Sequence, residues 1–510
     1  MVSKLKAAAV ITVLIILCVF VLSSCGKEEY AKAYTLKELY AAADGEYDAI
    51  SMEDIYIPPS MDLQKLGLFF ASNSGWVRYD SENVPFDSQK PIIIFAHGMG
   101  TGSFGPYRAK WLAAGYNVGC FMWSQFSDDS PFIGQSKVWG IYNGKMRWSK
   151  NSGGYEKNDV PSHSVAEIYA ACYNDFMSQH DFCGSEIRLY GHSLGAQLTV
   201  ALSSYFMSAV ETGKMNPEYL PDRVSLLDPY LSNDIDAIYV TWLDKTLEDC
   251  GSVKATLDTV IRLKNKGIAV ELVRSSPWVE IAALAYKSGE DGYNEALKDE
   301  VAHLSIDTGF LPSKYGMIDG IAACHEVGED WYSGSIDKGL WTDNAANASG
   351  GYGISSVTPT SYTYARMGSK YELDINESEK DYSDDIQRSV NINSAKIAGF
   401  VFLDKNSNGI MDDRLCNRLS NVTVTLYEKG KKKPVTTYTT GTSGYYEFLT
   451  EVGKNYYIKV SPVKNYAFSQ ITDADSLYMS NNIGSDGISA IFTPANSASL
   501  IIVNAGIIAN

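Results

Sequence analysis

A serine between two glycines is the feature of this chain most directly suited to chemistry. Residues Gly191–Gly195 read Gly-His-Ser-Leu-Gly, after the apolar segment Ile187–Tyr190 and before the helix-like segment Ala196–Leu202. A serine hydroxyl becomes an effective nucleophile when a sharp turn presents it beside a base and N–H donors. The two glycines let a strand and a helix approach closely enough for that turn. The context predicts a nucleophile at Ser193; the alternative is a glycine-rich turn with an incidental serine.

A second turn supplies candidate N–H donors for the oxyanion that forms when a hydroxyl attacks an acyl group. The apolar segment Pro91–Ala96 is followed by His97-Gly98-Met99. We expect the backbone N–H of Met99 to be one donor and that of Leu194, after the nucleophile, to be the other. His97 is then expected to shape the loop and not to act as the base.

An acid that orients the base is expected at the carboxyl end of a buried strand. Asp228 follows the apolar segment Val224–Leu227 and precedes Pro229, which ends the strand. The segment between Ser193 and Asp228 has room for one helix and one strand. Asp228 is therefore the predicted acid, with Asp222 and Asp244 as weaker alternatives.

One chain order in which such sites occur is serine, acid, histidine, and in that order the base follows the acid. Two of the chain's six histidines, His303 and His325, follow Asp228. His303 lies within a segment typical of a strand, where a side chain is usually packed. His325 is expected on a loop leading to a terminal helix, from which it can reach the serine. We favour His325 as the base, with His303 as the alternative.

Together these motifs resemble the α/β-hydrolase superfamily, and within it the lipase branch that includes the pancreatic-type enzymes. That branch has a His-Gly oxyanion loop, a Gly-His-Ser-Leu-Gly elbow and a Leu-Asp-Pro acid motif. The resemblance covers about residues 90–345 and implies hydrolysis of carboxylic esters through an acyl-enzyme, without a cofactor. Met99 stands where the lipases commonly carry a bulkier aromatic residue. The cysteine framework of the secreted animal enzymes is not recognisable.

Apolar strand-like segments alternate with helical ones over residues 46–345. This alternation predicts an α/β domain with a mostly parallel sheet and helices on both faces. The expected strands are Leu66–Phe70, Pro91–Ala96, Val118–Trp123, Ile187–Tyr190, Val224–Leu227 and Ala269–Val273, and the expected helices are Tyr107–Ala114, Ser164–Met177, Ala196–Glu211, Thr256–Lys266 and Pro277–Lys287.

An aromatic segment, Ser127–Pro161, separates one expected strand from the next helix. It carries Trp139, Tyr142, Trp148 and Tyr155 among glycines and lysines. A lid over the site and an excursion packed on the core are both consistent with this composition.

The first 24 residues have the pattern of an export signal. Two lysines precede the apolar run Ala7–Leu22, and Ser23-Ser24-Cys25 follows it. This end resembles a bacterial lipobox, which implies lipidation of Cys25 and an acyl anchor in a membrane. An uncleaved anchor or an ordinary signal peptide is the alternative. Residues 25–45 are expected to form a tether with an early helix.

The composition changes after the α/β domain. Residues 346–394 are polar and then acidic, which predicts a solvated linker. Residues 395–510 alternate with period two in the segments Ile397–Leu403, Val422–Tyr427, Tyr445–Phe448 and Tyr456–Val460. This pattern predicts a small all-β sandwich at the C-terminus.

A loop in this β domain carries oxygen-bearing side chains at alternating positions with a glycine at its sixth, a pattern suited to a hard cation. The strand, the loop and the following segments resemble the B-type repeat domains of bacterial surface adhesins, in which the loop binds calcium. The resemblance implies ligands at Asp404, Asn406, Asn408, the Ile410 carbonyl and Asp412. Position twelve is Leu415 where a glutamate is expected. An Asn/Asp/Gly turn without metal uses the same residues.

The net charge of −17 argues against nucleic-acid binding, which requires a basic surface. The eight cysteines include no Cys-x-x-Cys pair, and no disulfide is predicted. The leading hypothesis is a surface lipoprotein esterase or lipase acting on an acyl ester, with a cell-surface or extracellular partner for the β domain. A catalytically silent adhesion or scaffold protein is one alternative. Another is an α/β-hydrolase that cleaves a peptide or thioester bond.

Overall fold

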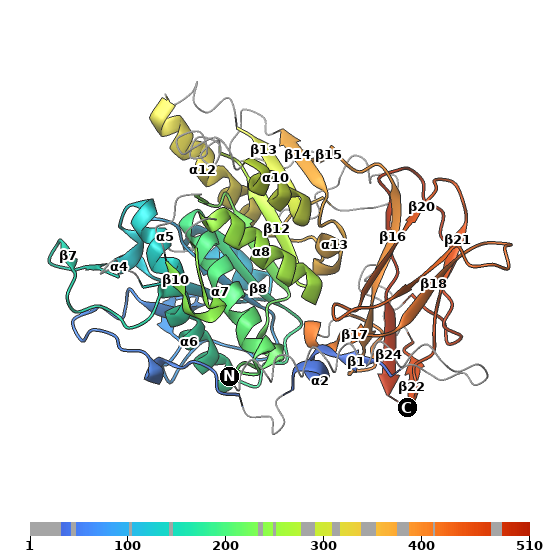
Figure 1. The fold of residues 1–510 in the computed structure, drawn as a ribbon, viewed down its shortest axis with the longest axis horizontal. Coiled ribbons are helices and arrows are strands. Elements are labelled where there is room, and N and C mark those ends of the chain that lie inside the picture. The colour runs from blue at the N-terminus through green and yellow to red at the C-terminus, as the bar shows by residue number, and fades with distance from the viewer. Residues whose placement is uncertain are drawn as a thin grey trace.

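The computed structural model describes most of the chain and divides it into two domains in contact (Figure 1). The predicted signal, Cys25, the predicted helix at Pro277–Lys287 and the predicted ligand Asp412 lie outside the described residues. No helix within the described residues has both the length and the apolarity needed to span a bilayer. The described residues are 32–41, 47–100, 105–141, 146–232, 238–247, 251–276, 291–308, 317–337, 353–374, 387–411, 414–470 and 482–509.

A ten-stranded sheet in the order β15-β14-β13-β12-β9-β8-β4-β5-β2-β3 forms the centre of the larger domain. Neighbouring strands from β14 to β5 run parallel, whereas β2, β3 and β15 pair antiparallel. This order defines the α/β-hydrolase fold and confirms the predicted fold class. The strands are β2 (Gly67–Ser72), β3 (Gly75–Arg78), β4 (Ile92–Ala96), β5 (Asn117–Met122), β8 (Ile187–His192), β9 (Arg223–Leu227), β12 (Ala269–Arg274), β13 (Ala302–Asp307), β14 (Lys370–Asp374) and β15 (Gln387–Ser389).

Two hydrophobic cores cover the two faces of this sheet. One contains the buried sides of α6 (Val165–Ser178), α7 (Leu194–Glu211) and α8 (Gly251–Lys266). The other contains side chains of α3 (Gly105–Ala113) and α12 (Met317–Gly334), including the fully buried Trp111 and Trp331. Burial on both faces explains why the central strands are almost continuously apolar. The remaining helices of this domain include α4 (Ser124–Ser127), α5 (Pro131–Trp139), α10 (Asp291–Glu300) and α13 (Thr360–Ala365).

The segment predicted as a linker, residues 346–394, differs from that expectation in its described part. Strand β14 pairs with β13 and β15, so both linker strands extend the central sheet. Tyr371 and Leu373 are buried, and they alternate with the charged residues Lys370, Glu372 and Asp374. The alternation of apolar and polar residues is short, and acidic and small polar residues flank it. The composition of the segment therefore favoured a solvated linker. The α/β domain therefore extends beyond residue 345.

The C-terminal domain is a sandwich of two sheets, as predicted. One sheet has the order β20-β16-β24-β22 with β23 also paired to β16, and the other has the order β19-β18-β21. The strands are β16 (Ala395–Leu403), β18 (Thr423–Glu428), β19 (Thr436–Thr439), β20 (Tyr445–Thr450), β21 (Tyr456–Val460), β22 (Tyr466–Phe468), β23 (Leu500–Ile502) and β24 (Ala505–Ala509).

A buried ion pair joins the two domains. Arg414, from the loop after β16, lies 2.7 Å from Asp222, which directly precedes β9. The same carboxylate accepts hydrogen bonds from the backbone N–H of Leu415 and of Ile187. Burial and the Arg414–Asp222 attraction act in opposite directions on the pKa of Arg414, and the net effect raises it. Asp222, a weaker alternative for the catalytic acid, therefore serves the domain contact.

Aromatic packing and the N-terminal segment extend this contact. Tyr364 of α13 packs against Phe400 and Tyr445 of the sandwich, with ring centroids 5.4 and 4.8 Å away. Figure 1 shows α13 between the sheet and β16. Strand β1 (Tyr34–Thr35) pairs with β17 (Leu419–Ser420), and the following helix α2 (Leu36–Tyr40) begins with a capping box. The early helix is thus present, but the described part of the predicted tether is packed between the domains.

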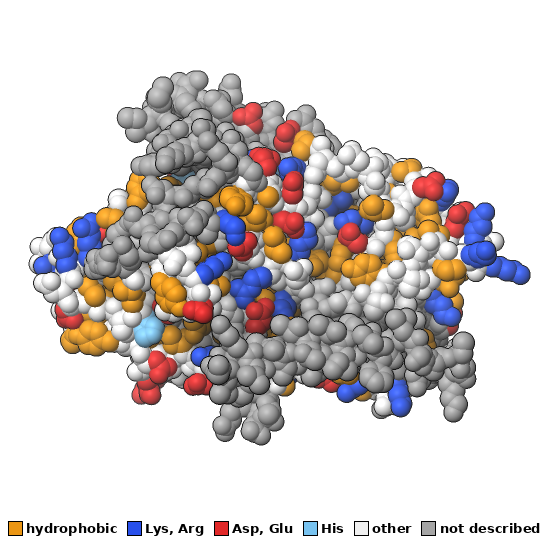
Figure 2. Space-filling view, in the orientation of Figure 1, with side chains coloured by type: hydrophobic (Ala, Val, Ile, Leu, Met, Phe, Trp, Pro, Cys, Tyr) orange, Lys and Arg blue, Asp and Glu red, His pale blue; other side chains and the backbone are white. Residues whose placement is uncertain are grey.

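The surface shown in Figure 2 carries acidic and basic side chains interspersed among apolar and neutral ones. The negative net charge is therefore not gathered into a single acidic field on this face. Two neighbouring groups of opposite sign stabilise each other only weakly at an exposed site. The Asp222–Arg414 pair differs from these exposed groups because both of its side chains are buried.

Replacing Asp222 by alanine is expected to destabilise the protein by about 3–5 kcal/mol, because it leaves a buried guanidinium unpaired. The measurement is urea unfolding of the full chain, followed by circular dichroism. Glu211→Ala provides the control, since Glu211 forms a partly exposed pair with Arg262, and we expect a loss below about 1 kcal/mol. Equal effects of the two substitutions would contradict the structural role given to Asp222.

Candidate active site

Ser193 occupies a sharp turn between β8, which ends at His192, and α7, which begins at Leu194. Its backbone has φ 57° and ψ −124°, a conformation that a residue with a side chain rarely adopts. The flanking glycines make the turn sterically feasible. A Cβ on Gly191 would lie 2.3 Å from the carbonyl oxygen of Gly195, and a Cβ on Gly195 would lie 2.1 Å from that of Ala96.

The predicted oxyanion loop lies against this turn. A Cβ on Gly98 would lie only 2.9 Å from the Cβ of Ser193, so glycine is needed there as well. His97 is buried, and its Nε2 accepts the backbone N–H of Trp123 at 3.3 Å. Its Nδ1 therefore carries the proton and donates to the carbonyl oxygen of Gly98 at 2.9 Å. Burial lowers the pKa of His97 to about 4, which leaves the ring neutral as a scaffold for the loop.

The two predicted oxyanion donors belong to residues that line the same cavity as Ser193. Leu194 is the first residue of α7, so its N–H has no acceptor within the helix, and the helix N-terminus favours a negative charge. Met99 follows Gly98, and both Met99 and Leu194 line the same cavity as Ser193. This arrangement suits the donor roles predicted for the two backbone N–H groups.

Asp228 lies at the carboxyl end of β9, beside the end of β8 that leads to Ser193. Its carboxylate lies 2.5 Å from Nδ1 of His325, and it accepts further hydrogen bonds from the N–H groups of Ser275 and Ser276 and from the Ser276 hydroxyl. Burial raises the pKa of Asp228, but these hydrogen bonds and the attraction of His325 outweigh it and lower the pKa. The two serines were not found by sequence analysis; their signal is their place directly after β12.

His325 projects from helix α12, within the helix itself, and not from a loop before it as predicted. His303 lies in β13 and is buried, and neither ring nitrogen has a hydrogen-bond partner among the described residues. Burial and the nearby Arg274 lower the pKa of His303 to about 3. Asp244 sits in a left-handed turn and is hydrogen-bonded to Tyr239. The structure thus brings His325, and not His303, to Asp228.

A cavity of about 550 Å³ opens beside Ser193 and His325. Met99, Pro131, Leu194 and Tyr230 contribute to its wall, and the side chain of Met99 is 57% exposed. Helix α5, from the aromatic insert, packs on α7: Trp139 is fully buried and donates to Gln197 at 3.0 Å. The described part of the insert is therefore an excursion packed on the core, and its residue Pro131 lines the cavity.

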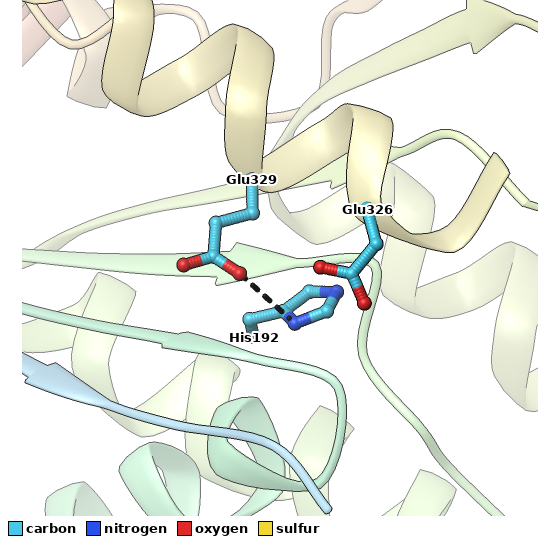
Figure 3. A group of neighbouring side chains, drawn as sticks. All are labelled: His192, Glu326 and Glu329. Atoms are coloured by element: carbon cyan, nitrogen blue, oxygen red, sulfur yellow. Dashed lines mark ion pairs between the residues drawn. The ribbon is translucent and has the colours of Figure 1, made fainter. Parts of the chain in front are cut away.

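One further polar group on the cavity wall consists of His192, Glu326 and Glu329 (Figure 3). Their potential ligand atoms lie within 4.8 Å of one another, a spacing within which a cation could bind. Both ring nitrogens of His192 already have partners, however. Nε2 donates to the carbonyl oxygen of His325 at 2.9 Å, and Nδ1 lies 3.1 Å from the carboxylate of Glu329. We therefore assign this group as a hydrogen-bonded contact and not as a metal centre.

Comparison with known proteins identifies the C-terminal domain. Residues 395–507 match the family model of the SdrD B-like domain. The comparison with curated proteins gives no match. The chain thus combines a domain with the α/β-hydrolase fold and an SdrD B-like domain.

Solved structures with similarity to parts of this chain include a pilin and two esterases. A streptococcal ancillary pilin shares 12% identity and a TM-score of 0.16, and the match covers 24% of this chain but only 35% of the pilin. Est1E from Butyrivibrio proteoclasticus shares 12% identity over 50% of this chain and 93% of its own, with a TM-score of 0.23. An esterase from the fungus Rhizomucor miehei shares 17% identity over 49% and 76%, with a TM-score of 0.24. The fold assignment itself rests on the strand order.

The buried neutral His303 predicts a loss of stability in acid. Its pKa of about 3 in the folded chain lies below the value of about 6.5 in an unfolded chain, so only the unfolded state gains this proton as the pH falls below about 6.5. Replacing His303 by leucine should remove about 2 kcal/mol of the stability difference between pH 8 and pH 5. Urea unfolding at both pH values measures it; parallel losses in wild type and variant would contradict the prediction.

Proposed function

We propose that this protein is a serine hydrolase that cleaves carboxylic esters through an acyl-enzyme on Ser193. One observation carries the proposal: the Asp228–His325 hydrogen bond lies at the wall of the cavity that Ser193 also lines. A nucleophile on a strained turn, an oriented imidazole and two N–H groups at the start of α7 and in the oxyanion loop are the parts that acyl transfer requires.

In the proposed reaction, Nε2 of His325 removes the proton from the Ser193 hydroxyl as the oxygen attacks the acyl carbonyl. Asp228 holds Nδ1–H of His325 and stabilises the imidazolium that forms. The N–H groups of Met99 and Leu194 donate to the oxyanion. His325 then gives its proton to the leaving alcohol, and in the second half of the reaction the same base activates water to release the acid.

Activity measurements distinguish this proposal from two alternative functions. A silent scaffold would retain the fold but not react at Ser193, although the complete set of Ser193, Asp228 and His325 favours catalysis. An enzyme acting on peptides or thioesters would react at Ser193 but prefer a different acyl bond. The apolar wall at Met99, Pro131 and Tyr230 favours an ester with an apolar acyl group.

The proposed location is the outer surface of a bacterial cell. The SdrD B-like domain and the lipobox-like sequence before Cys25 both support an exported, surface-anchored protein. An acyl chain on Cys25 would hold the enzyme at a membrane. The sandwich domain would present a surface to a cell-surface or extracellular partner.

We further propose that the loop after β16 holds a calcium ion. Asp404 is buried, and none of the described lysines or arginines pairs with its carboxylate. Asp404 accepts the N–H groups of Asn408 and Gly409 at 3.2 and 2.9 Å, and the side-chain oxygens of Asn406 and Asn408 also accept backbone N–H groups of the loop. Asp404, Asn406, Asn408, the Ile410 carbonyl and Asp412 would hold the ion, which would supply the positive charge that a buried carboxylate requires.

The calcium proposal predicts a metal-dependent thermal stability of the full chain. Millimolar calcium should raise the unfolding temperature relative to excess chelator, because a ligand that binds only the folded state stabilises it. Asp404→Asn should abolish this difference, whereas magnesium should not replace calcium in the wild type. Identical melting curves in calcium and chelator would overturn the proposal without affecting the ester hydrolysis.

The ester-hydrolase proposal predicts covalent labelling of Ser193 by a fluorophosphonate. Ser193→Ala should abolish labelling and turnover of nitrophenyl esters, and His325→Ala should lower kcat by about 10⁴-fold or more, as expected for loss of a triad member. His303→Leu is the matched histidine control and should retain turnover. Labelling of the Ser193→Ala variant at the wild-type rate would show the mechanism to be wrong. An acyl-chain series on the wild type then defines the preferred acid.

A further inference from the structure

His192 connects the turn that presents Ser193 to the helix that presents His325. It precedes Ser193 at the end of β8, and its Nε2 donates to the main-chain carbonyl of His325 at 2.9 Å. The two imidazole rings lie with centroids 4.5 Å apart. One turn further along α12, Glu329 lies 3.1 Å from the other ring nitrogen of His192. Figure 3 shows Glu329 reaching down from α12 to this ring.

This contact requires a proton between the two groups. Nε2 of His192 already carries a proton, because it donates to a carbonyl oxygen. Without a second proton, Nδ1 would present a lone pair to a carboxylate oxygen, and two acceptors at 3.1 Å repel each other. The proton resides either on Nδ1, which gives an imidazolium–carboxylate pair, or on the Glu329 carboxyl. In both cases the pair holds one proton in addition to that on Nε2.

The surroundings of Glu329 favour retention of that proton. Glu329 is largely buried, and burial raises its pKa to about 7 against the opposing effect of His192. Glu326 and Asp330, from the same helix, raise it further. Tyr190 of β8 faces it, and Tyr107 of α3 is hydrogen-bonded to Asp330. No lysine or arginine is among the groups that act on Glu329 in the part of the chain described here.

We propose that His192 and Glu329 form a proton-dependent clamp that positions His325 over Ser193. The inference rests on the proposed function. With the proton in place, the two hydrogen bonds of His192 fix α12 against the nucleophile turn. When the pair loses that proton, Nδ1 and the carboxylate repel each other, the clamp opens and His325 is no longer held at the geometry for proton transfer. Glu329 is thus a positioning residue, and it does not touch the reacting atoms.

The clamp predicts an alkaline limb in the pH dependence of turnover. Activity falls at alkaline pH as the His192–Glu329 pair loses its shared proton. Two substitutions of Glu329 distinguish the effect of its hydrogen bond to His192 from the effect of its charge. Leucine removes the hydrogen bond, whereas the amide of glutamine can donate to Nδ1 of a neutral His192 at every pH.

The experiment measures kcat and KM on a nitrophenyl ester across pH for the wild type, Glu329→Leu, Glu329→Gln and the control Glu326→Gln. We expect Glu329→Leu to lower kcat about 10- to 100-fold with KM within about twofold, since a misplacement of about 1 Å is sufficient for such a loss. Glu329→Gln should restore kcat and lose the alkaline limb. Glu326→Gln should keep the alkaline limb and move it to lower pH, because the charge of Glu326 raises the pKa of Glu329.

Two results would overturn the clamp. One is wild-type kcat in Glu329→Leu at the pH optimum; the other is an unchanged alkaline limb in Glu329→Gln. Circular dichroism and unfolding midpoints show whether each variant folds, and the near-isosteric glutamine variant provides a folded comparison. Failure of the ester-hydrolase proposal is distinct, because the wild type would then neither turn over the ester nor label at Ser193.

Discussion

Backbone contact between β8, α7 and the end of β4 is the constraint on which the site depends. A Cβ on Gly195 would lie 2.1 Å from the carbonyl oxygen of Ala96 and 2.4 Å from that of His97. Such contacts leave no room for a side chain, and they hold Ser193 in a backbone conformation that costs about 1–3 kcal/mol. The surrounding packing must offset this cost. The same contact brings the predicted oxyanion loop to the start of α7, so the positions of the candidate nucleophile and of the predicted N–H donors have one structural origin.

The parallel strand order explains why residues far apart in the sequence meet at this turn. Strands β4, β8, β9 and β12 are neighbours, and their carboxyl ends lie at one edge of the sheet. Asp228 extends from β9 with φ 38°, and its N–H donates to the carbonyl oxygen of Val273 at 2.7 Å. The next residues after β12 then donate to its carboxylate. A buried acid thus stays ionised because the adjacent strand end supplies hydrogen bonds in place of water.

Short motifs in the sequence predicted those parts of the candidate site that depend on local structure. The glycines around Ser193 indicate a sharp turn, and the strand before Asp228 and the position of His325 after that acid follow from the expected strand order. The period-two segments after residue 395 predict a sandwich. Contacts between distant segments left no such signal. The pairing of Asp222 with Arg414, and of His192 with Glu329, depends on tertiary packing that no local pattern encodes. Strand β14 was missed because acidic composition outweighed a five-residue alternation.

Helix α12 contacts the central sheet at two points along its length. At the first, Glu329 pairs with His192, which directly precedes Ser193 at the end of β8. Further along, the hydroxyl of Tyr332 lies 2.9 Å from that of Ser225 in β9 and donates to Glu271 of β12 at 2.5 Å. Glu271 in turn pairs with the buried Arg223. Asp222, directly before β9, therefore contacts the sandwich domain, Ser225 within the strand contacts Tyr332 of α12, and Asp228 directly follows the strand. The SdrD B-like domain is consequently attached to the strand that carries the candidate acid, so its docking and the geometry of the site share one element.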